Sequence, residues 1–318
     1  MNVLVTGADG FVGRSLCRLL RESGMYVRGA VRRFTESAEF EPIVIGDIGP
    51  DTQWRAALAG IDVVVHLAAR VHVMRDTAAD PLAAFCAVNL HGTTNLAEQA
   101  RQAGVKRFVF VSSAKVHGES TGERPYSEDQ PPQPQGPYAL SKWAAEQALA
   151  GVAGRGMQLA ILRPPLVYGP HVRGNFLALL NAVQRGWPLP LAAIENRRSL
   201  LYVGNLAHAI ASCISHAAAA GRTFLVSDRE DLSTPELVRA LAAALQVQAR
   251  LIAIPPTVLR LAGALIGQGE AVERLTGSLQ LDTSRIARDL GWSPPHSVPE
   301  ALAATARWYR QAVLGAAV

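Results

Sequence analysis

The sequence is poor in cysteine and has no long apolar run. Cys17, Cys86 and Cys213 show no C-x-x-C spacing, which excludes a disulfide framework and a cysteine-based zinc cluster. All three lie in segments of helical pattern among apolar residues, so we expect them to be small, buried core residues. The stretch 258–266 carries Arg260 and is too short to span a bilayer. These features predict neither a metal site nor a membrane partner.

Basic residues exceed acidic ones, but they form no cluster. The net charge is +5, while the arginines occur at most as short pairs such as Arg32-Arg33. Without a Lys- or Arg-rich run there is no footprint for nucleic acid, and a mildly basic protein suits an anionic substrate. The 318 residues, 49% of them hydrophobic, indicate a globular chain large enough for two lobes. A strand that starts at residue 2 leaves no room for a signal peptide, so we expect a cytoplasmic protein.

The chain opens with a strand, a glycine-rich turn and a helix. Residues 3–5 are apolar and predict a buried strand, and from Val12 onward apolar residues recur at helical spacing. The turn carries Gly7, Gly10 and Gly13, spaced one residue wider than the usual dinucleotide fingerprint. Gly7 would form the tight turn, Gly10 would let a diphosphate approach, and Gly13 would let the helix pack closely on the strand. Free N–H groups at the helix start favour phosphate. The stretch therefore predicts a dinucleotide site.

Strands and helices alternate after this opening. Strands apolar on both faces indicate a parallel sheet covered by helices on both sides, that is, an α/β fold with a Rossmann-type doubly wound sheet. The residues after 228 have a mainly helical pattern. Gly7, Asp47, Ala68 and Ser113 each follow a strand, at the edge where such sheets bind ligands. We expect strands at 26–31, 42–45, 63–65, 107–111, 159–162, 200–203 and 223–226, and helices at 81–103, 138–153, 175–185 and 206–219.

Tyr138 and Lys142 are four residues apart and share a face of a predicted helix. An ammonium beside a phenol stabilises the phenolate and lowers the phenol pKa from its usual value of about 10. A tyrosine of this kind can move a proton to or from a substrate oxygen. Ser113, at a strand end, could hydrogen-bond the same oxygen, although its position also suits a turn cap. The three residues are therefore candidates for a catalytic set.

Several motifs in a fixed order carry a resemblance to a known family. On them the chain resembles the extended short-chain dehydrogenase/reductases, the group of nucleotide-sugar epimerases, dehydratases and reductases, over almost its whole length. The motifs are T-G-A-D-G-F-V-G at 6–13, G-D-I at 46–48, H-L-A-A at 66–69, N-L-H-G-T at 89–93, S-S-A-K-V-H-G at 112–118, Y-A-L-S-K at 138–142, L-R-P-P-L-V-Y-G-P at 162–170, R-S-L-L-Y-V-G-N-L-A at 198–207 and L-D-T-S-R-I-A-R-D-L-G-W at 281–292.

The resemblance implies a role for each matched position. Tyr138 would be the acid/base, Lys142 its partner and the ribose anchor, and Ser113 a hydrogen-bond donor to the substrate. A Rossmann domain would comprise residues 1–165 and 200–228, and a substrate lobe residues 166–199 and 229–318. Homodimers would form through the helices near 92–103 and 138–152. Cofactor contacts would come from Gly7, Gly10, Phe11, Val12, Gly13, Asp47, Ile48, Leu67, Ala68, Ala69, Asn89, Tyr138, Lys142 and Pro165, and substrate contacts from Ser113, Asn175, Arg198 and Arg274.

Departures from the family pattern narrow the choice of cofactor and the choice of reaction. Members that use NAD carry an acidic residue after the second strand for the ribose 2′-hydroxyl, whereas Arg32 and Arg33 stand here and suit a 2′-phosphate. We therefore expect NADP(H), with NAD(H) as the alternative. Dehydratases carry Asp-Glu directly after the serine. Ala114 and Lys115 cannot protonate a leaving hydroxyl as a carboxylic acid does, which argues against a 4,6-dehydratase. Lys115 suits a substrate contact and a solvated loop end equally well.

Histidines offer a weaker signal. His117 replaces the tyrosine of the family's V-Y-G, and its usual pKa would allow acid/base work. A lone histidine is more often a hydrogen-bonded packing residue, and we interpret His117, His66 and His72 in that way.

The serine motif and the paired arginines together favour one reaction within the family. They are most similar to those of reductases that act on the C4 keto group of nucleotide-linked, UDP-N-acetyl 6-deoxy-hexuloses for surface polysaccharides. The first alternative is a UDP-hexose 4-epimerase with tightly bound NAD. The second is a non-catalytic NADP-sensing protein, which the retention of Ser113, Tyr138 and Lys142 disfavours. The substrate class in the first two cases is a nucleotide-diphosphate sugar.

Overall fold

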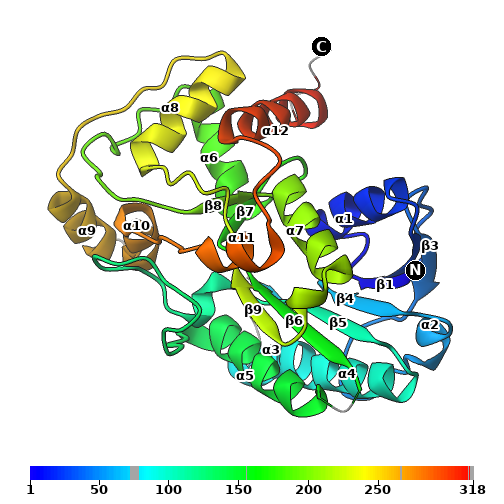
Figure 1. Ribbon diagram of the computed structural model, residues 1–318. Helices are drawn as coiled ribbons and strands as arrows, with labels where there is room; N and C mark the ends of the chain where they lie inside the picture. The colour runs from blue at the N-terminus through cyan, green and yellow to red at the C-terminus, as the bar shows by residue number, and fades with distance from the viewer. Residues whose placement is uncertain (72–78, 155, 266, 314, 316–318) are drawn as a thin grey trace.

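A sheet of seven parallel strands forms the larger part of the molecule (Figure 1). The computed structural model describes residues 1–71, 79–154, 156–265, 267–313 and 315, so that His72 lies outside the described residues. The strand order is β3-β2-β1-β4-β5-β6-β9, and every neighbouring pair is parallel. The strands are β1 (Asn2–Thr6), β2 (Tyr26–Val31), β3 (Glu41–Val44), β4 (Val63–His66), β5 (Arg107–Val111), β6 (Gln158–Arg163) and β9 (Arg222–Leu225).

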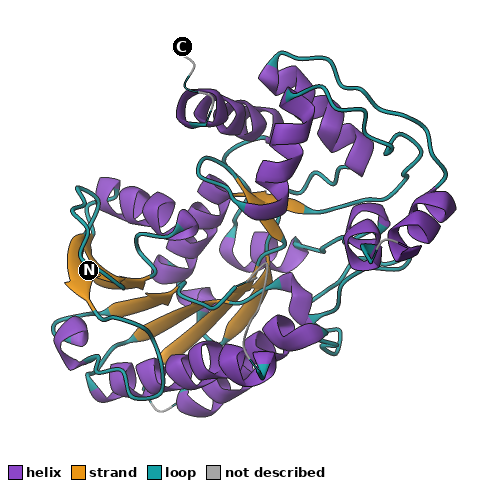
Figure 2. Cartoon of the chain, turned by 180° about the vertical axis from the view of Figure 1, so that it is seen from behind, coloured by secondary structure: helices purple, strands orange, loops and turns teal. Residues whose placement is uncertain are grey.

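Helices cover both faces of the sheet (Figure 2). Successive strand residues point to opposite faces, so Val3 and Val5 enter one core and Leu4 enters the other. The first core is closed by α1 (Phe11–Glu22), α7 (Val203–Ser215) and α11 (Ser284–Leu290). The second is closed by α2 (Arg55–Leu58), α4 (Thr93–Gln102) and α5 (Gly136–Val152). The predicted α/β fold with a doubly wound parallel sheet is confirmed.

The strand order reverses beside β1. β1 pairs with β2 on one side and with β4 on the other, so the chain crosses over between β3 and β4. At such a switch point the loops after the two central strands diverge and leave a crevice, which is where ligands of these folds bind. Here the two loops start at Gly7 and Leu67, so both predicted turn motifs reach the same place.

A smaller, mainly helical lobe lies beyond the carboxyl edge of the sheet (Figure 1). Its short strands β7 (Leu166–Tyr168) and β8 (Leu200–Tyr202) pair in parallel. The sequence predicts β8 but not β7, which follows directly on Pro164 and Pro165. A core of its own, which includes Tyr168 and Phe176, joins these strands to α6 (Gly174–Gln184), α8 (Thr234–Leu245) and α12 (Val298–Ala312). Beside it, α9 (Pro256–Leu265) packs on α10 (Gly269–Thr276). In contrast, Ile286 and Trp292 pack into the first core of the sheet.

The predicted helix 81–103 is continuous but not uniform. It consists of α3 (Pro81–Cys86), a π-helical segment (Ala87–Gly92) and α4. Asp80 caps its start by accepting the N–H of Ala83, and Pro81 occupies the first turn. A π segment inserts one extra residue and is often found at functional sites.

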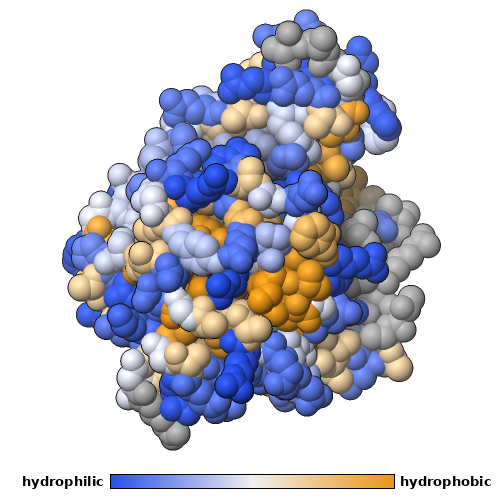
Figure 3. All heavy atoms as spheres, turned by 90° about the vertical axis from the view of Figure 1, so that its right-hand side faces the viewer, coloured by the Kyte–Doolittle hydropathy of each residue, from blue (hydrophilic) through white to orange (hydrophobic). Residues whose placement is uncertain are grey.

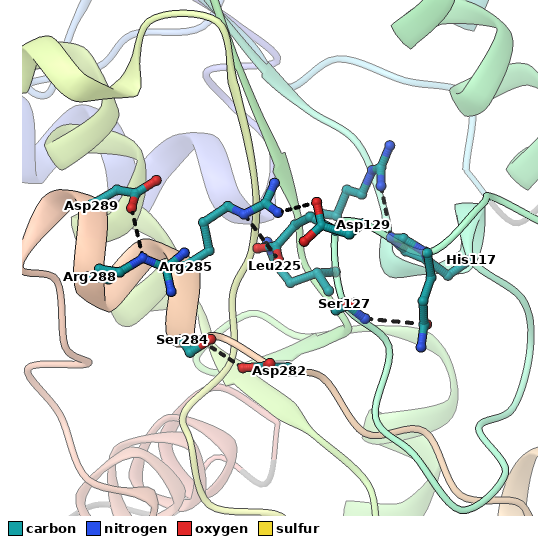
Figure 4. A network of polar contacts seen from close by, with 12 residues as sticks. His117, Ser127, Asp129, Leu225, Asp282, Ser284, Arg285, Arg288 and Asp289 are labelled. Carbon is teal, nitrogen blue, oxygen red and sulfur yellow. Dashed lines mark hydrogen bonds and ion pairs between the residues drawn. The ribbon is translucent and has the colours of Figure 1, made fainter.

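The long loop that precedes α5 is fixed by polar contacts to the distant part of the chain. Glu128 accepts the backbone N–H of Leu225 at 2.8 Å, and Arg285 of α11 pairs with both Glu128 and Asp129. Figure 4 shows Arg285 pointing toward Asp129 and the end of β9, with His117 at the start of the same loop. The loop is therefore held between the sheet and α11.

Three further expectations concern absences and cysteines. Within the described residues no helix combines the length and apolar character needed to cross a membrane, and no cluster of metal-binding side chains is found in that part of the chain. Cys17 and Cys213 are buried, as predicted, and burial raises the pKa of each thiol to about 12. Cys86, the last residue of α3, is only half buried, so the prediction of a buried core residue was wrong there.

Candidate active site

The glycine turn lies at the switch point. Gly7 has a φ of +66°, which favours glycine, and a Cβ on Gly13 would overlap with the carbonyl oxygen of Gly7. α1 starts after Gly10, and no side chain caps its first N–H groups. The neighbouring Phe11 and Val12 are half buried, and Phe11 packs against the core of the second lobe. The turn is thus a bare backbone surface with N–H donors, which fits the diphosphate of a dinucleotide.

The loop after β4 is fixed against this turn by a buried histidine. The Thr6 hydroxyl accepts the N–H groups of Leu67 and Ala68, both at 3.1 Å. It therefore donates its own proton to His66 Nδ1, at 2.8 Å, and His66 Nε2 donates to Thr93 Oγ1 at 2.9 Å. Burial lowers the pKa of His66 to about 3, so the ring is neutral. His66 is the hydrogen-bonded packing residue that the sequence predicts, and the network ties β1, β4 and α4 together.

The same network sets the width of the crevice. A Cβ on Gly7 would lie 3.2 Å from the backbone nitrogen of Ala68, so the two loops touch without room for a side chain. Leu67, Ala68 and Ala69 are all half buried and follow the β4 end directly. These predicted cofactor contacts therefore line the switch-point crevice opposite the glycines.

The residues predicted to distinguish NADP from NAD lie at the far end of the crevice. Arg32 and Arg33 are exposed after β2, and the Arg32 guanidinium pairs with Asp47 at 2.9 Å. Asp47 and Ile48 border a shallow hollow together with Val44 and Ile45. Figure 3 views the molecule from the side of β3 and α2 and shows apolar side chains grouped among polar ones on that face. Ion pairs this exposed contribute little to stability, so Arg32 can exchange its partner.

Ser113 and Tyr138 meet at the end of β5. Ser113 caps the short 3-10 helix Ala114–Val116, its Oγ accepting the Lys115 N–H at 3.2 Å. Burial raises the pKa of the Tyr138 phenol to about 12, and the neighbouring Ser113 hydroxyl acts in the opposite direction. Tyr138 lies in the first turn of α5, which begins at Gly136. The turn-cap role and the contact with Tyr138 are therefore both realised.

Lys142 is buried on the same helix face. Its Nζ lies 4.0 Å from the centre of the Phe110 ring. Burial lowers the Lys142 pKa to about 7, and the negative charge of Glu146 acts in the opposite direction. The sequence predicts that an ammonium at Lys142 lowers the Tyr138 pKa; this was wrong, because burial raises it and Lys142 is not among the causes of the shift. The same burial penalises both charged forms, so it raises the pKa of the phenol and lowers that of the amine.

The π segment places Asn89 beside this pair. The Asn89 amide donates to Ser141 Oγ and to the carbonyl of Arg70, both at 3.0 Å, and its oxygen accepts the Arg70 N–H at 2.8 Å. Ser141 Oγ in turn donates to the carbonyl of Tyr138 at 2.8 Å. Asn89 is buried and joins the helix that carries Tyr138 and Lys142 to the loop after β4.

The predicted substrate residues lie on both sides of the gap between the lobes. Lys115 pairs with Glu119, with both carboxylate oxygens at 2.8 Å from its Nζ. Arg198 donates to the carbonyl oxygens of Arg274, at 2.7 Å, and of Gly277, at 2.9 Å. Sequence reasoning missed Glu119, because no motif includes it. Of the other predicted contacts, Pro165 is half buried after β6, and Asn175 is exposed in the first turn of α6.

His117 belongs to a buried polar cluster. Arg163 donates to His117 Nε2 at 2.8 Å and forms a close ion pair with Glu146. Burial, aided by the Arg163 charge, lowers the His117 pKa to about 4. The ring also stacks on Tyr126. His117 is thus neutral and hydrogen-bonded, in agreement with its interpretation as a packing residue.

Similarity to known proteins agrees with this geometry. The family model described as NAD dependent epimerase/dehydratase family matches residues 3–227. The chain belongs to the NAD dependent epimerase/dehydratase family. The chain is 42% identical to a UDP-glucose 4-epimerase of Vibrio cholerae, over 98% of this chain and 96% of the relative. It is 31% identical to a dTDP-glucose 4,6-dehydratase of Streptomyces griseus, over 98% and 94%.

A solved structure, MoeE5 in complex with UDP-glucose and NAD, shares the family fold with a TM-score of 0.79 and 27% identity, over 98% of this chain and 100% of that chain. This member of the epimerase/dehydratase family is therefore an enzyme of the extended short-chain dehydrogenase/reductase type, as the sequence predicts. The predicted preference for NADP stays a prediction, because the family is described as NAD-dependent.

Proposed function

We propose that the protein is a 4-epimerase of UDP-linked hexoses. The strongest support is the local chemistry beside Ser113: the residues that follow it are Ala114 and an ion-paired Lys115, and no carboxylic acid is adjacent to it. That arrangement can exchange hydrogen at one carbon but cannot eliminate water as a dehydratase does. The 42% identical relative named as a UDP-glucose 4-epimerase and the UDP-glucose complex of MoeE5 favour the same substrate class.

In this proposal the chain's own residues handle the proton at the sugar oxygen. Tyr138 removes the proton of the C4 hydroxyl and later returns it, and the Ser113 hydroxyl donates to the same oxygen. Lys142 anchors the ribose and supplies positive charge when protonated, and Asn89 holds the helix that carries both residues. The bare glycine turn and the Leu67–Ala69 loop would hold the diphosphate of the dinucleotide. When bound, the nicotinamide group supplies the hydride acceptor and donor for C4.

The bound cofactor and the overall redox balance test the proposal. Protein purified without added cofactor is denatured, and the released dinucleotide is measured. The native protein is then given UDP-glucose alone, and UDP-galactose is measured by chromatography. Interconversion without added NAD and without net absorbance change at 340 nm supports the epimerase, as 340 nm is where reduced nicotinamide absorbs. Absence of interconversion with UDP-glucose and with UDP-N-acetylglucosamine contradicts it.

A second candidate rests on Arg32 and Arg33. No acidic side chain follows β2, and Arg32 can leave its exposed pair with Asp47 for a 2′-phosphate. This favours an NADPH-dependent reductase of the C4 keto group of a UDP-linked 6-deoxy-hexulose. Wild type would then bind NADPH at least tenfold more tightly than NADH, and Arg32→Asp would reverse the order. Stoichiometric consumption of NADPH with a UDP-4-keto sugar supports the reductase, while equal affinity for both cofactors contradicts it.

We also propose that the enzyme forms a homodimer through α4 and α5. The two helices pack side by side on one face of the sheet, and a shallow groove between them is lined by small and polar side chains such as Thr94 and Ala148. Small side chains allow a second helix pair to approach closely. Sedimentation velocity of wild type and of Ala148→Arg measures the state: a dimer that dissociates in the variant supports the proposal, and a monomeric wild type overturns it.

A further inference from the structure

The ion pair between Lys115 and Glu119 has two close contacts and is partly shielded from solvent, unlike a pair on the open surface. Both carboxylate oxygens of Glu119 lie 2.8 Å from Lys115 Nζ. The side chains are 28% and 35% exposed, so the pair is partly shielded but still open to a ligand. The backbone N–H of Lys115 donates to Ser113 Oγ. The pair therefore starts one hydrogen bond away from the hydroxyl that contacts Tyr138.

Backbone contacts place the other end of this pair beside the second lobe. Two residues after Glu119, the N–H of Thr121 donates to the carbonyl of Ser278 at 2.8 Å. The preceding residue, Gly277, accepts the guanidinium of Arg198. Burial lowers the pKa of Arg198, and the negative charge of the neighbouring Glu119 acts in the opposite direction. The order in space is thus Ser113, Lys115, Glu119, Arg198, from the reacting centre to the second lobe.

This inference rests on the proposed function, which puts the sugar C4 at Ser113 and Tyr138, and on the predicted substrate contact of Arg198, which would put the diphosphate of the UDP-sugar there. The hexose ring must then lie along the Lys115–Glu119 pair. We propose that this pair selects uncharged hexoses over hexuronates, because Glu119 cancels the charge of Lys115 and presents a carboxylate to the sugar. Neutral hydroxyl or acetamido groups can hydrogen-bond to the pair, whereas a hexuronate carboxylate meets no free cation there and is repelled by Glu119.

The test measures affinity, so it does not depend on turnover. Dissociation constants for UDP-glucose and UDP-glucuronate are measured by calorimetry on cofactor-loaded protein, and the ratio of the two is compared between variants. The diphosphate is common to both ligands, so the ratio isolates the C6 group. Glu119→Gln frees Lys115 and is expected to shift the ratio about tenfold toward UDP-glucuronate. Lys115→Met leaves Glu119 unopposed and is expected to shift it about tenfold the other way.

Two further variants separate charge from shape. The double variant Lys115→Met/Glu119→Gln restores neutrality, and its ratio should return to within about threefold of wild type. Glu22→Gln, at the exposed end of α1, removes the same charge far from the site and should leave the ratio unchanged. A ratio that does not move in Glu119→Gln, or that moves in the same direction in both single variants, overturns the inference. Thermal melts identify a variant that has lost its fold, and the other single variant then decides.

The two proposals fail separately. If UDP-glucose binds but is not epimerised, the proposed function is wrong and the affinity ratio still tests the pair. If UDP-glucose is epimerised but the ratio stays constant across the variants, the selection by Lys115 and Glu119 is wrong alone. If neither UDP-sugar binds to wild type, both are overturned.

Discussion

Burial shifts the pKa values of Tyr138 and Lys142 in opposite directions, in each case toward the neutral form of the side chain. Burial raises the phenol pKa to about 12 and lowers the amine pKa to about 7. Near pH 7 the phenol is therefore neutral, while the amine is divided about equally between its neutral and protonated forms. The neighbouring Ser113 hydroxyl acts against burial and favours the phenolate. A proton leaving the substrate must consequently be received by a group whose environment changes when ligands bind.

Tyr138→Phe tests whether Tyr138 is the group that transfers the proton. The ring and its packing against Phe85 are kept, while the acidic hydroxyl is lost. We expect turnover to fall by about 10²- to 10⁴-fold, with the affinity for UDP-sugar changed only a few-fold. Tyr26→Phe removes an exposed phenol of β2 and should change neither. Steady-state kinetics and calorimetry give both numbers, and a Tyr138→Phe enzyme with near wild-type turnover would exclude Tyr138 as the acid/base.

Gly13→Ala tests the close contact of α1 with the glycine turn. An added methyl group would overlap with backbone atoms of Gly7 and Ala8, and backbone cannot move aside cheaply. We expect a loss of about 1–3 kcal/mol in the free energy of unfolding, together with weaker binding of the dinucleotide. Gly122→Ala, where a methyl group meets open space at an exposed loop position, is the control and should be nearly neutral. Urea unfolding and cofactor titration measure the two effects, and equal stability of both variants contradicts the tight contact.

Elements near the site owe their positions to hydrogen bonds between buried polar side chains. The π segment at Ala87–Gly92 shifts the helix by one residue and brings Asn89 to Ser141 and to the loop after β4. The hydrogen bond between Thr6 and His66 likewise joins the ends of β1 and β4. These contacts set the distance between the elements, while the apolar cores decide only which faces meet.

Asn89→Ala should remove the hydrogen bonds that join α5 to the loop after β4. Three hydrogen bonds of a buried amide are lost, which we expect to cost about 1–3 kcal/mol of stability because polar partners are left unsatisfied. Since α5 carries the catalytic candidates, we expect kcat to fall by more than KM rises. Asn95→Ala, which loses contacts of similar number to the loop at 49–52, should reduce stability without this kinetic split. Thermal melts and steady-state kinetics decide, and a variant altered only in stability would limit Asn89 to the fold.

The sequence predicts helices and strands better than it predicts the contacts between them. Apolar runs suffice for the seven strands of the sheet, since each buried strand carries its own signal. The strand β7 is not predicted, and the π segment cannot be, because it differs from an α-helix by a single inserted residue. Among the site residues, motif spacing marks Gly7, Ser113, Tyr138 and Lys142. Glu119 is not marked, because its relation to Lys115 and Arg198 depends on how a loop of the first lobe meets the second.

At the scale of the whole molecule, the second lobe is joined to the sheet by strand-like contacts and not by a linker. Tyr126 exchanges backbone hydrogen bonds with Gln280 and Asp282, and Ser199 and Leu279 link the next segments. Buried Asp228 accepts the N–H of Tyr202 and the amide of Asn205, which also binds the backbone of His296. These contacts span the chain from its middle to its end, so unfolding of either lobe removes partners from the other.

Such coupling makes acid stability a property of the whole chain. His66 and His117 are neutral and hydrogen-bonded in the folded state, with pKa values of about 3 and about 4 in place of the usual value near 6.5. Between those values and 6.5 the unfolded chain binds more protons than the folded one. Their contribution to stability is therefore fully present above pH 6.5 and is lost as the pH falls toward 4 and 3.

We expect the free energy of unfolding to fall on acidification from pH 6.5 to pH 4.5. Each histidine contributes a slope of about 1.4 kcal/mol per pH unit once its unfolded form is protonated. His66→Gln should be less stable at pH 7, because the bonds to Thr6 and Thr93 are disturbed, yet it should show a slope smaller by about one proton. His91→Gln, at an exposed position of the π segment, should keep the wild-type slope. Urea unfolding at half-unit pH steps gives these slopes. If His66→Gln lost stability with acid as steeply as wild type, the neutral, buried state of His66 would not be a source of the acid sensitivity, and His117 and the carboxylates of the molecule would have to account for it.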